Sequence, residues 1–324
     1  MNKVLIMGGA GYIGSHTVRH FLEQGYFCVV ADNLSCGHLE AIPTNAEFEK
    51  ADLMDKESLR AVFQKHEIDA VVHFAAFSLV GESVANPQKY YHNNVIGTLN
   101  LLDVMLEFGV NKIVFSSTCA TYGEPKYVPI DEQHPQAPIN PYGQTKLIIE
   151  NIFKDYQKAY GLKYIALRYF NAAGAMENAQ IGESHNPESH LIPLVLKAIN
   201  GERENIKVFG TDYNTPDGTC LRDYIHVNDL ASAHRLAVEK LDEYCGFVNL
   251  GTGIPTSVLE IIKAAEKVSG KACPVVYEQR RAGDPDILYA DNKKAREVLG
   301  WIPNYTNLED ILQTAWNWEI NRKF

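Results

Sequence analysis

The fold of this chain is decided by residues 3–14, which read Lys3-Val4-Leu5-Ile6-Met7-Gly8-Gly9-Ala10-Gly11-Tyr12-Ile13-Gly14. The first five residues have the pattern of a short buried strand, and residues 15–23 that follow carry apolar side chains at helical spacing. Gly8, Gly11 and Gly14 have the spacing G-x-x-G-x-x-G. Glycines at this spacing let backbone N–H groups approach a pyrophosphate while the N-terminus of the helix faces its charge. The stretch therefore predicts a strand, a glycine turn and a helix that bind a dinucleotide.

The next predicted strand, residues 27–31, ends at Asp32. A carboxylate at this point can accept hydrogen bonds from both hydroxyls of an adenosine ribose, and it would repel a 2′-phosphate. An ordinary tight turn is the alternative explanation for a lone glycine run. The strand before the glycines, the helix after them and the acid at the next strand end together favour a dinucleotide site, with NAD as the cofactor.

Strands and helices continue to alternate up to about residue 170. Strands are expected near 48–50 and at 70–74, 112–115 and 163–169, and helices at 56–64, 87–108 and 141–160. The uninterrupted apolar run 70–74 suits a parallel strand that is buried on both faces. Asn93 and Asn94 fall in the middle of the long helix 87–108, where short amides are unfavourable unless they are hydrogen-bonded. The fold class that follows is α/β, with a doubly wound parallel Rossmann-type sheet.

Beyond residue 171 the regular alternation becomes sparse. Helices are still expected at 191–200, 227–240, 257–268 and 308–320, and a strand at 247–250. We therefore expect an NAD-binding domain at residues 1–170 and a smaller C-terminal α/β lobe at residues 171–324, with segments near 226–250 returning to the first domain.

The composition limits the class of protein. With 46% hydrophobic and 22% charged residues, the chain has the composition of a soluble globular protein, and it contains no apolar run of the 18 or more residues that a membrane span requires. The apolar residues 4–7 stop at glycines, so we expect no signal peptide and a cytoplasmic location. A net charge of −10 argues against a broad nucleic-acid surface. No metal site or disulfide is expected, because the six cysteines are scattered: Cys28, Cys36, Cys119, Cys220, Cys245 and Cys273.

Tyr142 and Lys146 are the candidate catalytic pair. They stand four residues apart at the expected start of a helix, so both side chains lie on one face. A tyrosine that acts as a base at neutral pH needs roughly 4 kcal/mol of selective stabilisation of its phenolate. An ammonium at about 4 Å supplies on the order of 4 kcal/mol at an effective dielectric near 20, and a cationic cofactor ring would add to it. The alternative is an ordinary pair on a helix surface.

Three further groups of polar residues are candidates for ligand contacts. Ser116-Ser117-Thr118 ends the strand at 112–115, and in doubly wound sheets ligands sit beyond the carboxyl ends of strands. Residues 208–219 are rich in turn formers and lead into Leu221-Arg222-Asp223-Tyr224-Ile225-His226, which is typical of a ligand-facing loop that enters a short strand. Arg280 and Arg281 place two guanidinium groups in a predicted loop, where a solvated charge cluster is the alternative.

Taken in order, these motifs resemble the extended short-chain dehydrogenase/reductase family, and within it the epimerases that act at C4 of a UDP-hexose. The resemblance runs from Val4 to Trp318. The motifs that carry it are Gly8-x-x-Gly11-x-x-Gly14, Asp32-Asn33, Asp52-Leu53, Phe74-Ala75-Ala76, Ser116-Ser117-Thr118, Tyr142-x-x-x-Lys146, Arg168-Tyr169-Phe170-Asn171 and Arg222-Asp223-Tyr224-Ile225-His226.

The resemblance implies two sets of binding residues. Those around NAD would be Gly8, Gly11, Tyr12, Ile13, Gly14, Asp32, Asn33, Asp52, Leu53, Phe74, Ala75, Asn93, Tyr142, Lys146 and Phe170. Those around the UDP-sugar would be Thr118, Asn171, Phe209, Arg222, Tyr224, Val258, Arg281, Asp284 and Leu288. Two positions depart from the family pattern: Ser78 replaces a lysine near the cofactor phosphates, and His190 replaces an asparagine next to the nucleotide.

The activity that the resemblance implies is reversible epimerisation at C4, through hydride transfer to tightly bound NAD and a 4-keto intermediate. Tyr142 would take the proton of the 4-hydroxyl, Lys146 would keep the phenolate charged, and Thr118 would hydrogen-bond the same oxygen. Leu288 is smaller than the tyrosine that restricts other members to glucose and galactose, so weaker activity on UDP-N-acetylhexosamines is expected.

Two other functions are alternatives to the epimerase activity. A nucleotide-sugar dehydratase would need an acid, usually an Asp-Glu pair, where this chain has Thr118-Cys119. An NAD-binding regulator without catalysis would have little reason to retain Thr118, Tyr142 and Lys146 together.

The helices 87–108 and 141–160 resemble those that form a four-helix dimer interface in the family, so a homodimer is expected.

Overall fold

The computed structural model describes residues 3–281 and 284–324, and its largest element is a parallel sheet of seven strands. The strand order is β10-β6-β5-β4-β1-β2-β3, and every neighbouring pair is parallel. The strands are β1 (Lys3–Met7), β2 (Phe27–Asp32), β3 (Glu47–Lys50), β4 (Ala70–His73), β5 (Lys112–Thr118), β6 (Lys163–Tyr169) and β10 (Gly246–Leu250). The chain reverses its direction of travel across the sheet between β1 and β4, which is the switch point of a doubly wound fold. The predicted Rossmann-type α/β fold is confirmed.

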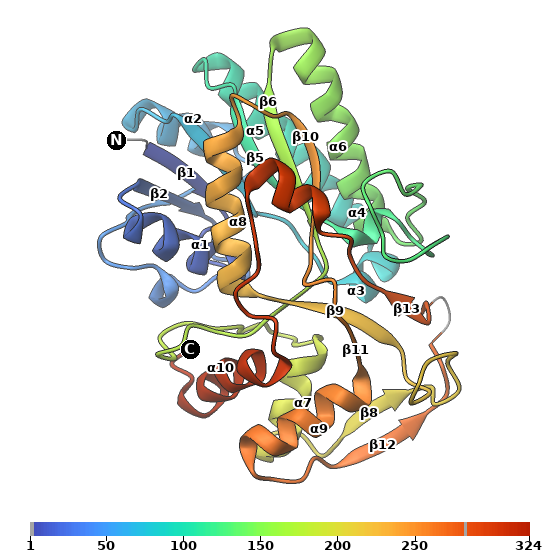
Figure 1. Ribbon diagram of the computed structural model, residues 1–324. Helices are drawn as coiled ribbons and strands as arrows, with labels where there is room; N and C mark the ends of the chain where they lie inside the picture. The colour runs from blue at the N-terminus through green and yellow to red at the C-terminus, as the bar shows by residue number, and fades with distance from the viewer. Residues whose placement is uncertain (1–2, 282–283) are drawn as a thin grey trace.

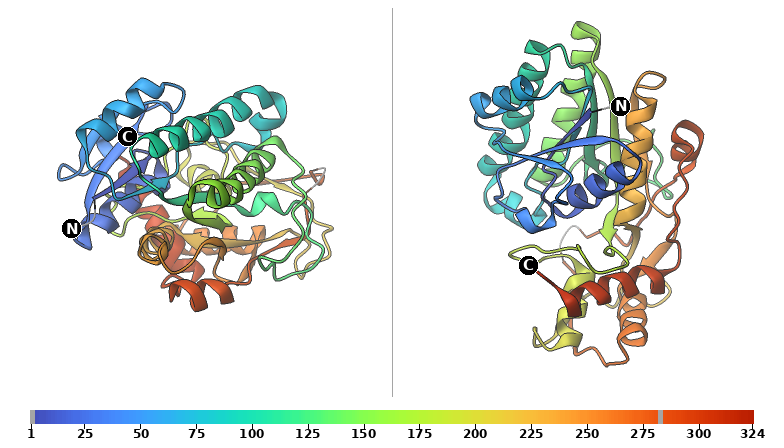
Figure 2. Two further views of the ribbon diagram at one scale, coloured as in Figure 1. Left: turned by 90° about the horizontal axis from the view of Figure 1, so that it is seen from above. Right: turned by 90° about the vertical axis from the view of Figure 1, so that its left-hand side faces the viewer.

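Helices cover both faces of this sheet (Figure 2, right). The helices α2 (Lys56–Lys65), α5 (Gly97–Glu107) and α6 (Pro141–Tyr160) share one hydrophobic core with the sheet, and α1 (Tyr12–Glu23) and α8 (Val227–Lys240) share the other. Within β1 the side chains alternate between the two cores, with Leu5 and Met7 on one side and Val4 and Ile6 on the other. Burial on both faces explains why the strands read as unbroken apolar runs.

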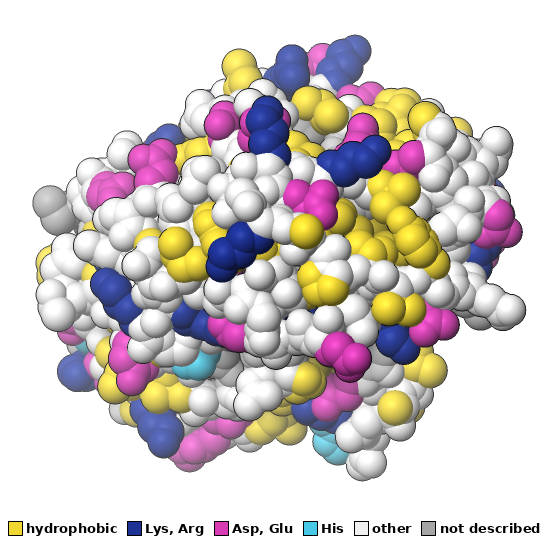
Figure 3. Space-filling model, turned by 90° about the horizontal axis from the view of Figure 1, so that it is seen from below, with side chains coloured by type: hydrophobic (Ala, Val, Ile, Leu, Met, Phe, Trp, Pro, Cys, Tyr) yellow, Lys and Arg dark blue, Asp and Glu magenta, His cyan; other side chains and the backbone are white. Residues whose placement is uncertain are grey.

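The rest of the chain forms a smaller α/β unit, which lies below the main sheet in Figure 1. It contains a four-stranded sheet of β7 (Asn171–Ala173), β9 (Leu221–His226), β11 (Pro255–Ser257) and β13 (Ile287–Leu288), and a parallel pair of β8 (Ile206–Phe209) and β12 (Val275–Glu278). The helices α7 (Leu191–Asn200), α9 (Val258–Ser269) and α10 (Leu308–Asn321) pack together around a third core. Charges of both signs are interspersed with small hydrophobic patches on the face seen in Figure 3.

Two predicted helices differ from the structure. The first helix begins at Tyr12 rather than Ser15, so Tyr12, Ile13 and Gly14 form its first turn. The single helix expected at 87–108 is divided into α4 (Pro87–Tyr90), a π-helical turn (Tyr91–Ile96) and α5. The π-turn contains Asn94, whose buried side chain bonds both the N–H and the C=O of Phe77 and also Thr145. A π-turn contains one more residue than an α-helical turn, and here it carries the side chain of Asn94 that makes these bonds to Phe77 and Thr145. Such turns are frequent at functional sites.

Four short elements complete the described part of the chain. They are α3 (Val80–Ala85), the 3-10 turns Leu39–Ala41 and Cys119–Thr121, and the π-helical turn Ala295–Leu299. None of the helices described is both long and apolar enough to cross a membrane.

Candidate active site

The glycine turn between β1 and α1 is as tight as its sequence predicts. Gly8 has a φ of +79°, and a Cβ added to it would lie 2.6 Å from the backbone N of Ala75. A Cβ on Gly14 would lie 2.2 Å from the carbonyl oxygen of Gly8. The cap residue of α1 is Gly11, so no side chain caps its first N–H groups. These N–H groups point out of the helix N-terminus and are suited to an anion such as a pyrophosphate.

The acids predicted around the adenosine lie together beyond β2 and β3. Asp32 is 8% exposed, and its carboxylate accepts hydrogen bonds from the N–H of Ala10 at 3.0 Å and of Leu34 at 2.8 Å. Burial raises the pKa of Asp32, and these two bonds oppose that rise. Asn33 donates to Asp52 at 3.0 Å. Leu53 is different, because its side chain is buried in the core beneath Gly97.

The remaining predicted cofactor residues follow the carboxyl ends of the central strands. Phe74 and Ala75 come directly after β4, and both donate their N–H to the carbonyl of Met7 beside the glycine turn. Asn93 lies in the π-turn and donates to Asn94 at 3.0 Å. Phe170 follows β6 and is buried.

The catalytic candidates come from α6 and β5, whose ends meet at the same edge of the sheet. Asn140 caps α6 by accepting the N–H of Gly143 at 2.8 Å, and Pro141 occupies the first turn. Lys146 is buried, and its Nζ donates to the carbonyl oxygen of Ser116 at 2.6 Å. The same Nζ lies 5.9 Å from the centre of the Tyr142 ring. The structure therefore brings the predicted pair together beside Thr118, the last residue of β5.

Burial is the main influence on the pKa values of Tyr142 and Lys146. Burial raises the pKa of Tyr142, and Tyr169 raises it further, while a hydrogen bond with Thr118 lowers it. Burial lowers the pKa of Lys146 to about 7, and the charge of Glu150 opposes that change. In the protein without cofactor, burial therefore outweighs the stabilisation of the phenolate that is expected from Lys146. A neighbouring positive charge from outside the protein is needed to bring the phenol into the range of a base.

Glu150 and Arg168 were not assigned a role from the sequence. Glu150 follows Lys146 by four residues on α6, and it is fully buried. Its carboxylate accepts from Arg168 Nε at 2.8 Å and Nη2 at 2.6 Å, and from Ser117 Oγ at 2.6 Å. The spacing Tyr142, Lys146, Glu150 is a stripe on one helix face, and extending the motif by one turn would have found it.

The predicted UDP-sugar residues gather on β9 and the segments beside it. Arg222 forms an ion pair with Asp284, and the guanidinium of Arg281 lies 3.8 Å from the centre of the Phe209 ring. Asn171 lies opposite Tyr224 in the β7–β9 register and donates to the carbonyl of Asp223 at 3.0 Å. The adjoining residues Ala282 and Gly283 lie outside the described part of the chain.

Leu288 and Val258 lie on different sides of this set. Leu288 stands opposite Arg222 in the β13–β9 register and packs against the cluster that contains Phe170. It therefore connects the predicted sugar residues with the predicted cofactor residues. Val258 begins α9 and packs against the core that contains Tyr224.

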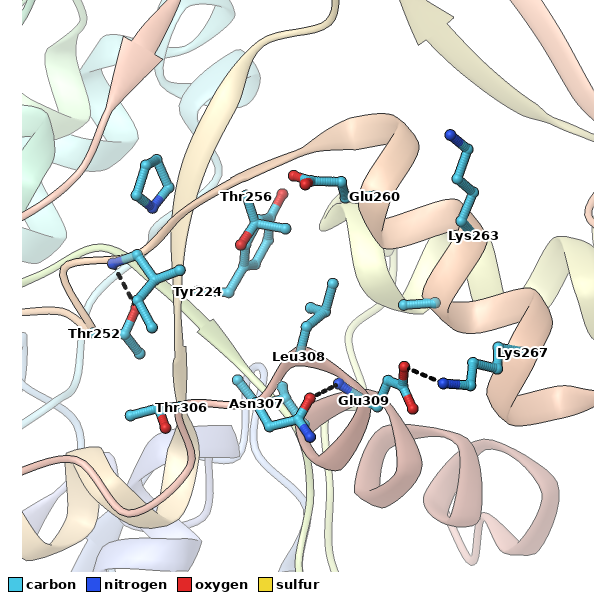
Figure 4. Close-up of a pocket in the computed structure, with 14 residues that line it drawn as sticks. Tyr224, Thr252, Thr256, Glu260, Lys263, Lys267, Thr306, Asn307, Leu308 and Glu309 are labelled. Atoms are coloured by element: carbon cyan, nitrogen blue, oxygen red, sulfur yellow. Dashed lines mark hydrogen bonds and ion pairs between the residues drawn. The ribbon is translucent and has the colours of Figure 1, made fainter. Parts of the chain in front are cut away.

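A cavity of about 490 Å³ lies between α9 and residues 306–309 (Figure 4). Tyr224 is the one predicted site residue among those that line it. Since Thr118, Tyr142 and Lys146 do not line it, we do not assign this cavity to the catalytic site.

The two departures from the family pattern lie at the protein surface. Ser78 is exposed. The side chain of His190 is 45% exposed, and its Nδ1 lies 2.7 Å from a carboxylate oxygen of Glu183.

Comparisons with known proteins agree with this geometry. The sequence model described as the NAD dependent epimerase/dehydratase family matches residues 4–251. A UDP-glucose 4-epimerase of Halalkalibacterium halodurans is 55% identical over 317 residues, which cover 97% of this chain and 95% of the relative.

Solved structures are similar over the same length. A UDP-glucose 4-epimerase from Brucella ovis in complex with NAD superposes with a TM-score of 0.95 at 51% identity, covering 98% of each chain. The UDP-Glc/GlcNAc 4-epimerase of Campylobacter jejuni superposes with a TM-score of 0.88 at 45% identity, covering 99% of this chain and 100% of the other. The chain therefore belongs to the NAD dependent epimerase/dehydratase family.

Proposed function

We propose that this protein is an NAD-dependent epimerase that interconverts UDP-glucose and UDP-galactose at C4. The observation that carries the proposal is the placement of Tyr142 and Lys146, one helical turn apart, at the sheet edge that also holds the glycine turn. The relatives named UDP-glucose 4-epimerase support it, because their identity to this chain extends over almost its full length.

The two parts of the fold divide the binding between them. Residues 1–170, with β10 beside β6, hold NAD, and residues 171–324 hold the UDP-sugar. Arg222 and Arg281 bind the diphosphate of the UDP, since a guanidinium group can donate two parallel hydrogen bonds to phosphate oxygens. The hexose is held loosely, because the 4-keto sugar must turn over to present its other face before it is reduced again.

The proton chemistry falls to Tyr142. It takes the proton of the sugar 4-hydroxyl as C4 is oxidised and returns it when C4 is reduced, while Thr118 hydrogen-bonds the same oxygen. The Nζ atom of Lys146 donates to the carbonyl of Ser116, and this hydrogen bond keeps the ammonium close to Tyr142. Bound NAD supplies the hydride acceptor and, in its oxidised form, the positive ring that the raised pKa of Tyr142 requires.

The residues fit this cofactor. The uncapped N-terminus of α1 suits the pyrophosphate, and the Asp32 carboxylate suits a ribose with free hydroxyls rather than a 2′-phosphate.

The two alternatives are less consistent with the site. A dehydratase needs a proton donor beside Thr118, and the neighbouring Cys119 is a poor one because burial raises the pKa of its thiol to about 12. A non-catalytic regulator would not need a buried lysine whose Nζ lies 5.9 Å from the centre of the Tyr142 ring.

The direct test is to incubate the purified protein with UDP-galactose and measure the formation of UDP-glucose. Wild type should reach an equilibrium mixture without added cofactor. The Tyr142→Phe variant should keep its thermal unfolding temperature and bound nucleotide but lose at least about 10²- to 10⁴-fold in kcat. Near-normal turnover of that variant would contradict the assignment of the base.

Three finer points belong to the same proposal. UDP-N-acetylhexosamines are poorer substrates, admitted past Leu288. The protein is a cytoplasmic homodimer that pairs through α6 and the helical segment 87–108, on which Ile96, Leu106 and Phe108 remain exposed. Sedimentation velocity tests the dimer, and a monomer at micromolar concentration would contradict it.

A further inference from the structure

A compact group of four side chains lies in the segment between β7 and α7. Glu183, His185, Glu188 and His190 each offer one ligand atom, and these four atoms lie within 4.8 Å of one another. We call them the 183–190 cluster. The scattered cysteines gave no reason to expect a metal site, but this cluster contains no cysteine and has the spacing E-x-H-x-x-E-x-H.

Four histidine–carboxylate contacts in the 183–190 cluster, in which Glu188 uses both of its oxygens, are close in length to the edges of a tetrahedral coordination site. The Nδ1 atom of His190 lies 2.7 Å from Glu183 Oε1 and 3.2 Å from Glu188 Oε1, and the Nδ1 atom of His185 lies 3.3 Å from Glu183 Oε1 and 3.5 Å from Glu188 Oε2. A tetrahedral zinc ion with bonds of about 2.0–2.1 Å separates neighbouring ligand atoms by about 3.3 Å. The four contacts bracket this value.

Hydrogen bonds satisfy one part of the cluster, because Glu188 Oε1 accepts the backbone N–H groups of Ser189 at 2.7 Å and His190 at 2.9 Å, but they do not satisfy the imidazole nitrogens. Each Nδ1 carries at most one proton, so two nitrogens cannot donate to four carboxylate contacts. The Nδ1 atom of His185 is buried and makes no hydrogen bond of acceptable geometry. A cation at the centre would contact all four ligand atoms at once.

The charge of the cluster points the same way. The side chains of Glu183 and Glu188 are only 6% and 4% exposed, and across residues 3–281 and 284–324 their ion pairs are with these two histidines. Buried carboxylates require a compensating positive charge.

We propose that the 183–190 cluster binds a divalent transition metal ion, with zinc as the best match. Two imidazoles and two carboxylates suit zinc, whereas magnesium and calcium prefer oxygen ligands alone. Four protein ligands leave no open position, so the ion is structural and takes no part in the epimerase chemistry.

The position of the cluster suggests what the ion stabilises. The ring of His185 lies edge-on to the ring of Tyr12 at 6.2 Å, and Tyr12 Oη donates to the carbonyl of Gly174 at 2.6 Å. His38 contacts the carbonyl of Ser184 at 3.2 Å. The ion therefore fixes the 183–190 segment against the first turn of α1, next to the glycine turn.

A second group, Glu47, Glu49 and His66, provides a matched control. Its ligand atoms also lie within 4.8 Å of one another, but it offers three ligands instead of four, and Glu49 already pairs with Lys65 at 2.6 Å. We expect no tight site there.

The experiment is a calorimetric titration of chelator-treated full-length protein with zinc chloride, on wild type, His190→Asn and Glu47→Gln. Wild type and Glu47→Gln should each bind one zinc ion, and zinc should raise their thermal unfolding temperature. His190→Asn should bind at least about 10- to 100-fold more weakly, because loss of a ligand costs no less than loss of its outer-shell partner.

Cobalt provides a second readout that does not depend on stability. It should give the strong visible absorption of a tetrahedral site in wild type, and His190→Asn, whose side chain is partly exposed and should not be needed for folding, should lose that absorption. No stoichiometric binding in wild type, or equal affinity in wild type and His190→Asn, would overturn the proposal. Loss of binding in Glu47→Gln would overturn it as well.

Discussion

Replacing Glu150 by glutamine should move the pH dependence of catalysis in a direction that the structure fixes. Glu150 is four residues after Lys146 on α6, and side chains at this spacing have Cβ atoms about 5–6 Å apart. Glu150 and Arg168 are both almost completely buried and form a bidentate ion pair. The charges of Glu150 and Arg168 nearly cancel at Lys146. Removing the charge of Glu150 leaves a net positive charge beside the ammonium, and removing that of Arg168 leaves a net negative charge.

The magnitude follows from the charge separation. At about 7 Å and an effective dielectric near 20, one charge changes the energy of the Lys146 ammonium by about 2 kcal/mol, which is between one and two pKa units. The pKa of Lys146 is already lowered to about 7 by burial, and Glu150 is the group that opposes this. Glu150→Gln should therefore lower it further, so that the ammonium is lost and kcat falls at a lower pH than in wild type.

Arg168→Met provides the opposite perturbation. It leaves Glu150 unpaired, which should raise the pKa of Lys146 and move the alkaline limb of the kcat profile to higher pH. Both variants break the same buried pair, so each should lose about 3–5 kcal/mol of unfolding free energy. Ser117→Ala removes one hydrogen bond to Glu150 without a change of charge, and it should cost about 1 kcal/mol and leave the profile in place.

The assay is kcat for UDP-galactose between about pH 5.5 and 9.5 for the four proteins, together with urea unfolding at pH 7. Opposite displacements of the alkaline limb in Glu150→Gln and Arg168→Met, at similar losses of stability, would support the reasoning. If the alkaline limb moved in the same direction in Glu150→Gln and Arg168→Met, or moved in neither variant, the reasoning would be refuted. The ion pair would then have a purely structural role.

Three further predictions test the cofactor, the substrate range and the acid stability. Denaturing the purified protein should release NAD and not NADP, because the Asp32 carboxylate accepts two backbone N–H bonds and would repel a 2′-phosphate; recovery of NADP would contradict this. Leu288→Tyr should lower kcat/KM for UDP-N-acetylgalactosamine relative to UDP-galactose by about 1–3 kcal/mol, and an unchanged ratio would show that Leu288 is not the gate. Burial lowers the pKa of His73 to about 3, below its unfolded value near 6.5, so the stability that neutral His73 contributes is present above pH 6.5 and is lost as the pH falls. When the pH is lowered from 7 to 5, the free energy of unfolding measured in urea should therefore fall by about 2 kcal/mol less in His73→Gln than in wild type. An equal fall in both proteins would refute this.

The sequence determined the main sheet and its glycine turn, because both depend on local patterns. Apolar runs of four or five residues, followed by glycines or polar residues, identify strands that are buried on both faces, and β1, β4 and β6 lie where these runs stand. The G-x-x-G-x-x-G spacing is similarly local, since a side chain on Gly14 would collide with Gly8 a few residues earlier. The spacing of Tyr142 and Lys146 placed both on one face of α6, because helical periodicity alone requires it.

Only the tertiary structure decided which groups act on that face. The pKa of Lys146 depends on its burial and on Glu150, and that of Tyr142 depends on its burial and then on Tyr169, which comes from β6. The π-turn at Tyr91–Ile96 depends on a contact between Asn94 and the distant Phe77. Likewise, Leu288 lies opposite Arg222 and against the cluster that contains Phe170 only because β13 pairs with β9, about 65 residues earlier in the chain. Local periodicity fixes which face of an element a residue occupies, whereas charge, burial and long-range pairing depend on segments that meet only when the chain has folded.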